Sequence, residues 1–195
     1  EAVRSVAVTS PRQGDGKTLV SANLAFGIAR QTKRRVLLID GDLRLPSIGK
    51  ALDLDAEYGL SDYLAGDVEL ERCMVKSADE RLFVIPQRKS LSQAPELLAN
   101  GVLAELMDTV RKRYPDWLVL IDCPPILAVD DTLVILRAVD RALLVVREGR
   151  TRKGEMRRAA EAIGREKYLG AVLNDSRSRG DSGRYYYYDY GYESR

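Results

Sequence analysis

The sequence predicts an α/β fold built on a doubly wound, mostly parallel sheet with helices on both faces. Two observations lead to this prediction. Short apolar runs alternate along the chain with segments of helical character, which implies right-handed crossovers between parallel strands. The apolar runs also lack the polar–apolar alternation of a half-exposed sheet, so we expect strands that are covered on both sides.

The first half of the chain begins with an apolar run and a helical segment, separated by a glycine-containing loop. A polar break at 33–35 precedes Val-Leu-Leu-Ile, four branched apolar residues that fit a central strand. Pro46 suits the first turn of a short helix, and Pro86 ends the third strand. In order, we expect a strand at 3–8, a helix at 19–31, a strand at 36–39, short helices at 46–52, 59–64 and 70–75, a strand at 82–85 and a polar loop at 87–93.

The second half continues the alternation. Pro95 suits the start of a further helix. The expected elements that follow are a helix at 102–113, a strand at 117–121, a helix at 132–138, a strand at 142–146, a helix at 153–166 and a strand at 169–173. Ligands of such sheets bind outside the carboxyl ends of the strands, so we look for the site there.

The composition is that of a soluble globular protein and excludes several classes of function. A chain of 195 residues forms most simply one domain, and its net charge of +2 implies no strong attraction to nucleic acid or anionic membranes. The absence of histidine rules out His-based triads and His metal sites. Cys73 and Cys123 lack metal-ligand spacing and are expected to be buried thiols in a reducing cytosol. No apolar run approaches 18 residues and no signal peptide is visible, while the start at Glu1 leaves upstream membrane spans open as an alternative.

A loop with the sequence TSPRQGDGKT, at 9–18, joins the first strand to the first helix. This strand–loop–helix arrangement cradles nucleotide phosphates, with glycines turning N–H groups inward and the helix dipole pointing at the same place. Lys17 would reach the β- and γ-phosphates of ATP, and the Thr18 hydroxyl would bind Mg²⁺. Pro11 stands where the eight-residue pattern has its leading Gly, so a purely structural turn is the alternative. The residues expected at the nucleotide are Gly14, Asp15, Gly16, Lys17, Thr18 and Leu19.

Three aspartates follow predicted strands at their carboxyl ends: Asp40, Asp42 and Asp122. Mg²⁺ needs oxygen ligands, and Asp42 or Asp122 would supply one directly or through water. Asp40 and Asp42 would share a face of an extended chain, so that one serves the metal while the other meets an incoming hydroxyl group. The alternative for each aspartate is a helix cap or a turn residue.

The chain changes character at residue 175, which divides it into a domain at 1–174 and a tail at 175–195. The tail begins with a Gly/Ser/Arg-rich linker typical of flexible segments. Six of the ten tyrosines of the chain follow within eight residues. An aromatic tail or an added edge strand is one interpretation, but tethered phenols also resemble a substrate for a neighbouring subunit. The candidate phosphate acceptors are Tyr185, Tyr186, Tyr187, Tyr188, Tyr190 and Tyr192.

Taken together, these motifs resemble the bacterial protein-tyrosine kinases (BY-kinases) of capsular and exopolysaccharide synthesis. The matching stretches are TSPRQGDGKT at 9–18, VLLIDGDLRLP at 36–46, LVLIDCPP at 118–125, GAVLN at 170–174 and the tyrosine-rich tail, with GLSDYLAG at 59–66 and APELL at 94–98 as further similar stretches. The resemblance implies a P-loop NTPase fold of the deviant Walker A type, which is shared with partitioning ATPases. Gln13 departs from the proline that is common in the family.

The resemblance also implies an activity and its residues. It implies ATP- and Mg²⁺-dependent autophosphorylation of the tail in trans, within a ring-shaped homo-oligomer, as a regulator of polysaccharide synthesis and export. The implied partners are tyrosine-containing proteins and a transmembrane activator or fused co-polymerase domain, at the cytoplasmic face of the membrane, and no nucleic acid. The implied roles are phosphate and metal binding for Lys17 and Thr18, metal-linked acids for Asp42 and Asp122, a base for Asp40, a motif arginine for Arg44 and adenine recognition for Asn174.

Two rival functions remain open from the sequence. A partitioning or cell-division-positioning ATPase shares the phosphate loop and the sheet, but usually carries Lys where Arg12 stands here, and lacks a tyrosine cluster. A non-catalytic assembly module would bind ATP only to hold subunits together. Labelled ATP separates the three, since only a kinase places label on tyrosine.

Overall fold

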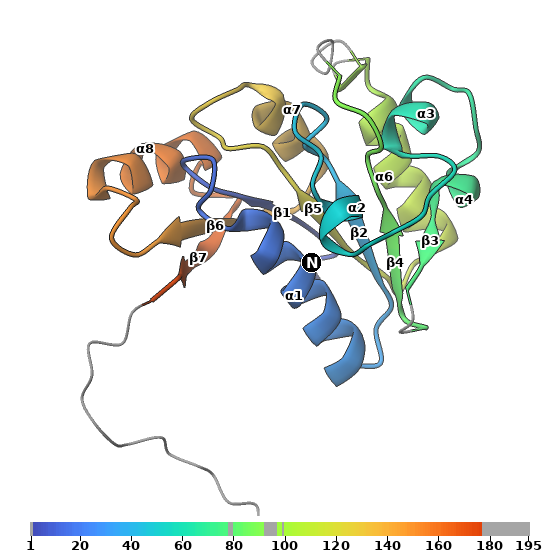
Figure 1. The fold of residues 1–195 in the computed structure, drawn as a ribbon, viewed down its shortest axis with the longest axis horizontal. Helices are drawn as coiled ribbons and strands as arrows, with labels where there is room; N and C mark the ends of the chain where they lie inside the picture. The colour runs from blue at the N-terminus through green and yellow to red at the C-terminus, as the bar shows by residue number, and fades with distance from the viewer. Residues whose placement is uncertain (1, 78–79, 92–96, 99, 177–195) are drawn as a thin grey trace, which may run out of the picture.

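The computed structural model describes residues 2–77, 80–91, 97–98 and 100–176 (Figure 1). These residues form a seven-stranded sheet in the order β3-β4-β2-β5-β1-β6-β7. Only the β3–β4 pair is antiparallel, so the sheet is mostly parallel as predicted. The strands are β1 Ser5–Thr9, β2 Val36–Asp40, β3 Val75–Lys76, β4 Leu82–Ile85, β5 Leu118–Asp122, β6 Arg141–Arg147 and β7 Tyr168–Asn174. The helices are α1 Lys17–Gln31, α2 Ile48–Ala51, α3 Leu60–Leu64, α4 Leu70–Cys73, α6 Val102–Arg113, α7 Asp131–Ala138 and α8 Lys153–Ile163.

Helices cover both faces of the sheet, and each face has its own apolar core. Successive residues of β2 illustrate the division: Leu38 packs in one cluster with α1 and α2, whereas Leu37 and Ile39 pack in the other with α3, α4, α6, α7 and α8. All five residues of β2 and of β5 are buried. The predicted doubly wound architecture is therefore confirmed, and continuous apolar runs are its cause, because a strand covered on both sides has no polar face.

The structure differs from the sequence prediction at several element ends. The predicted end of the helix at 70–75 is wrong: helix α4 ends at Cys73, and Val75 lies in the antiparallel strand β3. The last long helix ends at Ile163 rather than at residue 166, because Gly164 has a φ of 80° that a helix cannot contain. Most of the helix expected to begin at Pro95 lies outside the described residues; Leu97 and Leu98, which are described, are helical.

The helix expected from Pro46 begins later, at Ile48. The Asp40 carboxylate accepts hydrogen bonds from the backbone N–H groups of Ser47 and Ile48, both at 2.9 Å. These are N–H groups at the start of α2 that have no partner within the helix. The end of β2 therefore sets the place where α2 starts.

The sheet register brings the predicted acids to one edge. Asp40 at the end of β2 lies opposite Asp122 at the end of β5, and Val8 of β1 lies on the other side of Asp122. The loop that follows β1 therefore begins beside Asp122, and Asp40 lies one strand further along the sheet. Cys73 and Cys123 are free and buried, as predicted. None of the helices in the described part of the chain has the length and apolarity that crossing a bilayer requires.

Candidate functional site

The loop between β1 and α1, residues 10–16, has the backbone of a phosphate-binding loop. Gly14 and Gly16 adopt left-handed conformations, with φ of 81° and 92°, which side-chain-bearing residues adopt at a cost. The Asp15 carboxylate accepts a hydrogen bond from the Arg12 N–H at 3.0 Å, which ties the two ends of the turn together. Helix α1 begins directly afterwards at Lys17, so its N–H groups and its dipole point toward the loop.

The Lys17 side chain is buried at the carboxyl ends of the central strands and does not extend into solvent. Its Nζ is 3.3 Å from Asp42 Oδ2, and both side chains are largely buried. The other carboxylate oxygen of Asp42 accepts a hydrogen bond from the Leu45 N–H at 3.0 Å. This pair brings together the first helical residue and the segment after β2, as the sequence predicts for a shared site.

Asp122 is held by hydroxyl groups from α1. Its Oδ2 accepts a hydrogen bond from Thr18 Oγ1 at 2.7 Å, and its Oδ1 accepts one from Ser21 Oγ at 3.0 Å. Because Thr18 donates its only proton to Asp122, the Ser47 hydroxyl at 2.8 Å donates to Thr18. Burial raises the pKa of Asp122, while Lys17 and the two hydroxyl groups that donate to it act in the opposite direction.

Asp40 is fully buried, and only one of its two carboxylate oxygens accepts hydrogen bonds from the described part of the chain. Its Oδ2 accepts the two backbone hydrogen bonds at the start of α2, while its Oδ1 is buried and has no hydrogen-bond partner among the residues that the structure describes. Burial raises the pKa of Asp40 to about 7, and the neighbouring charge of Asp122 adds to the rise. A carboxyl group with this pKa exchanges its proton near neutral pH. By binding the N–H groups at the start of α2, Asp40 also performs the helix-cap role that the sequence left open as an alternative.

The oxygen atoms at this edge fit a magnesium ion that arrives with a nucleotide. Thr18, Asp42 and Asp122 supply the hard oxygen donors that Mg²⁺ prefers. Among the residues that the structure describes, no three acidic or cysteine side chains gather as a metal site. This is compatible with Mg²⁺, which is usually held by one or two carboxylates together with phosphate and water oxygens.

Two of the predicted site residues, Arg44 and Asn174, form their hydrogen bonds with groups other than Asp40, Asp42 and Asp122. The Arg44 guanidinium donates two hydrogen bonds to Asp131 at the start of α7, at 2.8 and 3.3 Å. Asn174, at the end of β7, donates from its amide Nδ2 to the carbonyl oxygen of Asp15 at 2.9 Å. Leu19 is 61% exposed in the first turn of α1, beside the phosphate loop. The candidate acceptor tyrosines lie outside the described residues.

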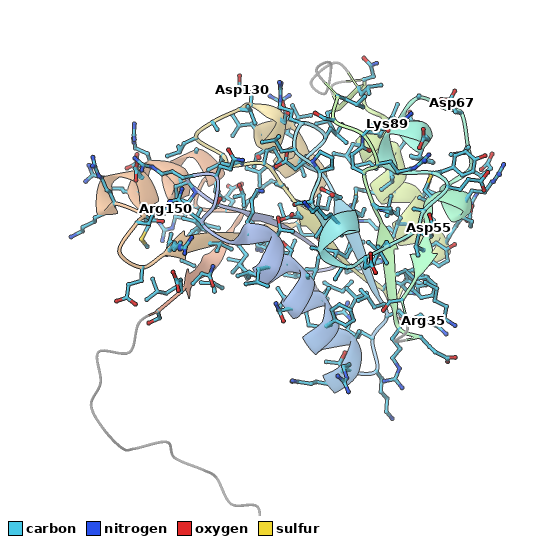
Figure 2. All side chains as sticks on the ribbon, viewed as in Figure 1. Arg35, Asp55, Asp67, Lys89, Asp130 and Arg150 are labelled. Carbon is cyan, nitrogen blue, oxygen red and sulfur yellow. The ribbon has the colours of Figure 1, made fainter. Side chains whose placement is uncertain are left out.

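Some residues that shape the site were missed in the sequence. Ser21 is one helical turn after Lys17, and this spacing could have indicated it. Arg147 and Arg150 donate hydrogen bonds to the carbonyl oxygen of Gly14 at 3.0 and 3.4 Å. Figure 2 shows Arg150 in the segment between β6 and α8. Nothing local in the sequence indicates these contacts, since they join segments more than a hundred residues apart.

The chain matches the family described as "AAA domain" over residues 3–154. It is 35% identical to the tyrosine-protein kinase YwqD of Bacillus subtilis, covering 88% of this chain and 72% of that protein. It is 38% identical to the putative tyrosine-protein kinase EpsB of Ralstonia nicotianae, and although 97% of this chain is matched, it spans only 26% of that protein.

Solved structures agree with these relatives. The kinase domain of the Escherichia coli tyrosine kinase ETK has a TM-score of 0.81 and 33% identity, covering 97% of this chain and 72% of that one. The septum site-determining protein MinD from Pyrococcus horikoshii, complexed with Mg-ADP, has a TM-score of 0.75 and 25% identity, covering 88% and 70%. The resemblance to tyrosine kinases and the P-loop NTPase fold are thereby confirmed.

Proposed function

The chain belongs to the bacterial tyrosine-protein kinases, and from this premise we propose that it transfers the γ-phosphoryl group of ATP to tyrosine hydroxyl groups, with Mg²⁺ as the metal. The observation that carries the proposal is the direct contact of the first two residues of α1 with the acids: Lys17 with Asp42, and Thr18 with Asp122. Phosphoryl transfer depends mainly on positioning and on charge stabilisation. This cluster offers both at the end of a phosphate loop.

Each member of the cluster has a proposed task. Lys17 binds the β- and γ-phosphates, since the loop places its ammonium group at the edge of the sheet where they would lie. The Thr18 hydroxyl and the carboxylates of Asp42 and Asp122 bind the metal directly or through water. The bound Mg²⁺ supplies positive charge that neutralises the phosphate oxygens during transfer.

We assign Asp40 the role of base on the basis of its unpartnered oxygen. Within the described part of the chain Oδ1 makes no hydrogen bond, and burial raises the pKa of Asp40 to about 7, so this oxygen can accept the proton of a tyrosine hydroxyl near neutral pH. Asp40 is completely buried. A hydroxyl group therefore reaches Oδ1 only when the residues that cover it move aside.

The acceptor is proposed to be the tyrosine cluster at 185–192, reached in trans within a homo-oligomer, with a ring as the proposed form. The support is the sequence itself, because six tyrosines fall within eight consecutive positions, at 185–192. In the same proposal the domain works at the cytoplasmic face of the membrane, together with a fused or separate membrane partner and tyrosine-containing substrates. Its role there is the regulation of polysaccharide synthesis and export.

A partitioning-type ATPase is the second candidate, and the similarity to MinD at 25% identity is the observation that favours it. Incubation with γ-labelled ATP and Mg²⁺, followed by phosphopeptide mass spectrometry, separates the candidates. Label on tyrosine supports the kinase. Release of free phosphate without labelled tyrosine supports the ATPase, and neither product supports an assembly module.

A further inference from the structure

Three side chains outside the phosphate loop hold three consecutive carbonyl groups of that loop. Arg150 donates to the Gln13 oxygen at 3.2 Å, Arg147 donates to the Gly14 oxygen at 3.0 Å, and Asn174 donates to the Asp15 oxygen at 2.9 Å. Arg150 makes a second, longer contact with the Gly14 oxygen at 3.4 Å. All three donors come from the last part of the domain, at the ends of β6 and β7 or just beyond. We call Arg147, Arg150 and Asn174 the carbonyl clamp.

The clamp has a consequence for the other side of the same peptide groups. In a trans peptide the C=O of one residue and the N–H of the next point in opposite directions, and the described residues contain no cis peptide. Holding the oxygens of residues 13, 14 and 15 on the clamp side therefore turns the N–H groups of Gly14, Asp15 and Gly16 away from it. A row of N–H groups that point the same way is the arrangement that binds phosphate oxygens.

The close approach of the carbonyl clamp also explains why residues 14 and 16 of the loop are glycines. A Cβ at Gly16 would lie 2.0 Å from Asn174 Nδ2, and a Cβ at Gly14 would lie 2.8 Å from a guanidinium nitrogen of Arg150. Side chains at these positions would push the donors off the loop. The glycines are therefore required twice, for their positive φ and for the close approach of the clamp.

Arg147 is itself held in place by the first residue after β7. Its Nε and one terminal nitrogen donate to Asp175 Oδ2 at 2.9 and 2.8 Å, which leaves its other terminal nitrogen for Gly14. A planar guanidinium fixed by two bonds has a defined direction for its third. Both side chains are partly exposed, so the pair orients Arg147 more than it stabilises the fold.

We propose that Arg147, Arg150 and Asn174 are positioning residues that preorganise the phosphate loop for the phosphate groups of a nucleotide. The proposal rests on the proposed nucleotide site, but it does not depend on tyrosine being the acceptor. A preorganised loop loses less conformational freedom when phosphate binds. The clamp thus acts on the affinity for phosphate groups and not on recognition of the base.

The test is equilibrium binding to the full chain, by competition with a fluorescent ADP analogue. The competitors are ADP and inorganic tripolyphosphate, which has phosphates but no base. Arg147→Gln, Arg150→Gln and Asn174→Ala are each expected to raise the Kd of both competitors by roughly threefold to tenfold, the effect of losing one hydrogen bond. Arg157→Gln is the matched control, because Arg157 is an exposed arginine of α8 that forms an ion pair with Glu161, one turn along the same helix.

Further variants keep the test decisive. Thermal unfolding without ligand identifies a variant that has lost its fold. Such a variant is then replaced by the matching substitution that keeps a hydrogen-bond donor: Arg147→Lys, Arg150→Lys or Asn174→Gln. For these we expect a rise in Kd smaller than that of the first variants. An unchanged Kd in all clamp variants overturns the proposal. A loss for ADP without a loss for tripolyphosphate also overturns it, because the residue then acts on the base or sugar. If Lys17→Met binds ADP as tightly as the unmodified protein, the nucleotide site is wrong and not only the clamp.

Discussion

Replacing Asp40 by Asn is expected to make the protein more stable at pH 8 while it abolishes tyrosine phosphorylation. The ordinary pKa of an aspartate is 3.8, and burial raises that of Asp40 to about 7. The folded protein therefore binds a proton between these two values that the unfolded chain has lost, so stability falls as pH rises from about 4 to about 7. Three pKa units at 1.36 kcal/mol each correspond to about 4 kcal/mol, a loss that is complete at pH 8.

Asn is a close match for the neutral acid. Its amide oxygen can accept the hydrogen bonds from Ser47 and Ile48 that Asp40 Oδ2 accepts, and it carries no charge to bury. The gain at pH 8 is expected to be about 2 to 4 kcal/mol, with the lower value allowing for relaxation of the coupled acid Asp122. Near pH 4 and below, the two proteins should differ little.

Urea unfolding at a series of pH values, without nucleotide or metal, measures this difference. The matched control is Asp55→Asn, the same chemical change at an exposed aspartate (Figure 2), for which no comparable gain is expected. Equal pH dependence in the unmodified protein and in Asp40→Asn would show that Asp40 does not hold a proton in the folded state. A stabilised variant that still phosphorylates tyrosine at the original rate would remove Asp40 as the base.

Three further perturbations test other parts of the site. Lys17→Met removes the partner of Asp42 and is expected to abolish labelling by γ-labelled ATP while circular dichroism shows a retained fold; labelling at the original rate would contradict the role of the lysine. Arg44→Gln leaves the buried carboxylate of Asp131 without its ion pair and is expected to destabilise the protein by about 1 to 3 kcal/mol in urea unfolding, since such a group loses a charged hydrogen bond; an unchanged midpoint would refute this. Phenylalanine at all six tyrosines in 185–192 should end autophosphorylation but leave ADP affinity unchanged, and undiminished labelling would place the acceptors elsewhere.

The core strands could be predicted from the sequence because burial on both faces leaves a continuous apolar run. The bounds of β4 and α6 agree with the prediction. Strand β3 was missed, since two residues, Val75 and Lys76, show no period. The start of α2 was also misplaced, because it depends on hydrogen bonds from Ser47 and Ile48 to Asp40, and not on the local preference of Pro46.

In the candidate site, too, the residues marked by a local sequence pattern could be predicted, and those that act through contacts between distant segments could not. The acids could be found because the carboxyl ends of parallel strands meet at one edge, and the register places Asp40 beside Asp122. The clamp could not be found, since Arg147 and Arg150 act on backbone carbonyl groups of a loop that has no complementary residue type in the sequence. Adenine recognition by Asn174 stays a prediction, and the contact of its amide nitrogen with the Asp15 carbonyl group was not foreseen.

Lys17, Asp42 and Asp122 form the site that, in this account, transfers the γ-phosphoryl group of ATP to tyrosine. Mass-spectrometric mapping of phosphate on the purified protein, after incubation with ATP and Mg²⁺, tests this assignment most directly. The account predicts phosphotyrosine within 185–192 in the unmodified protein and none in Lys17→Met. Phosphate absent from tyrosine in the unmodified protein, or present equally in Lys17→Met, would contradict it.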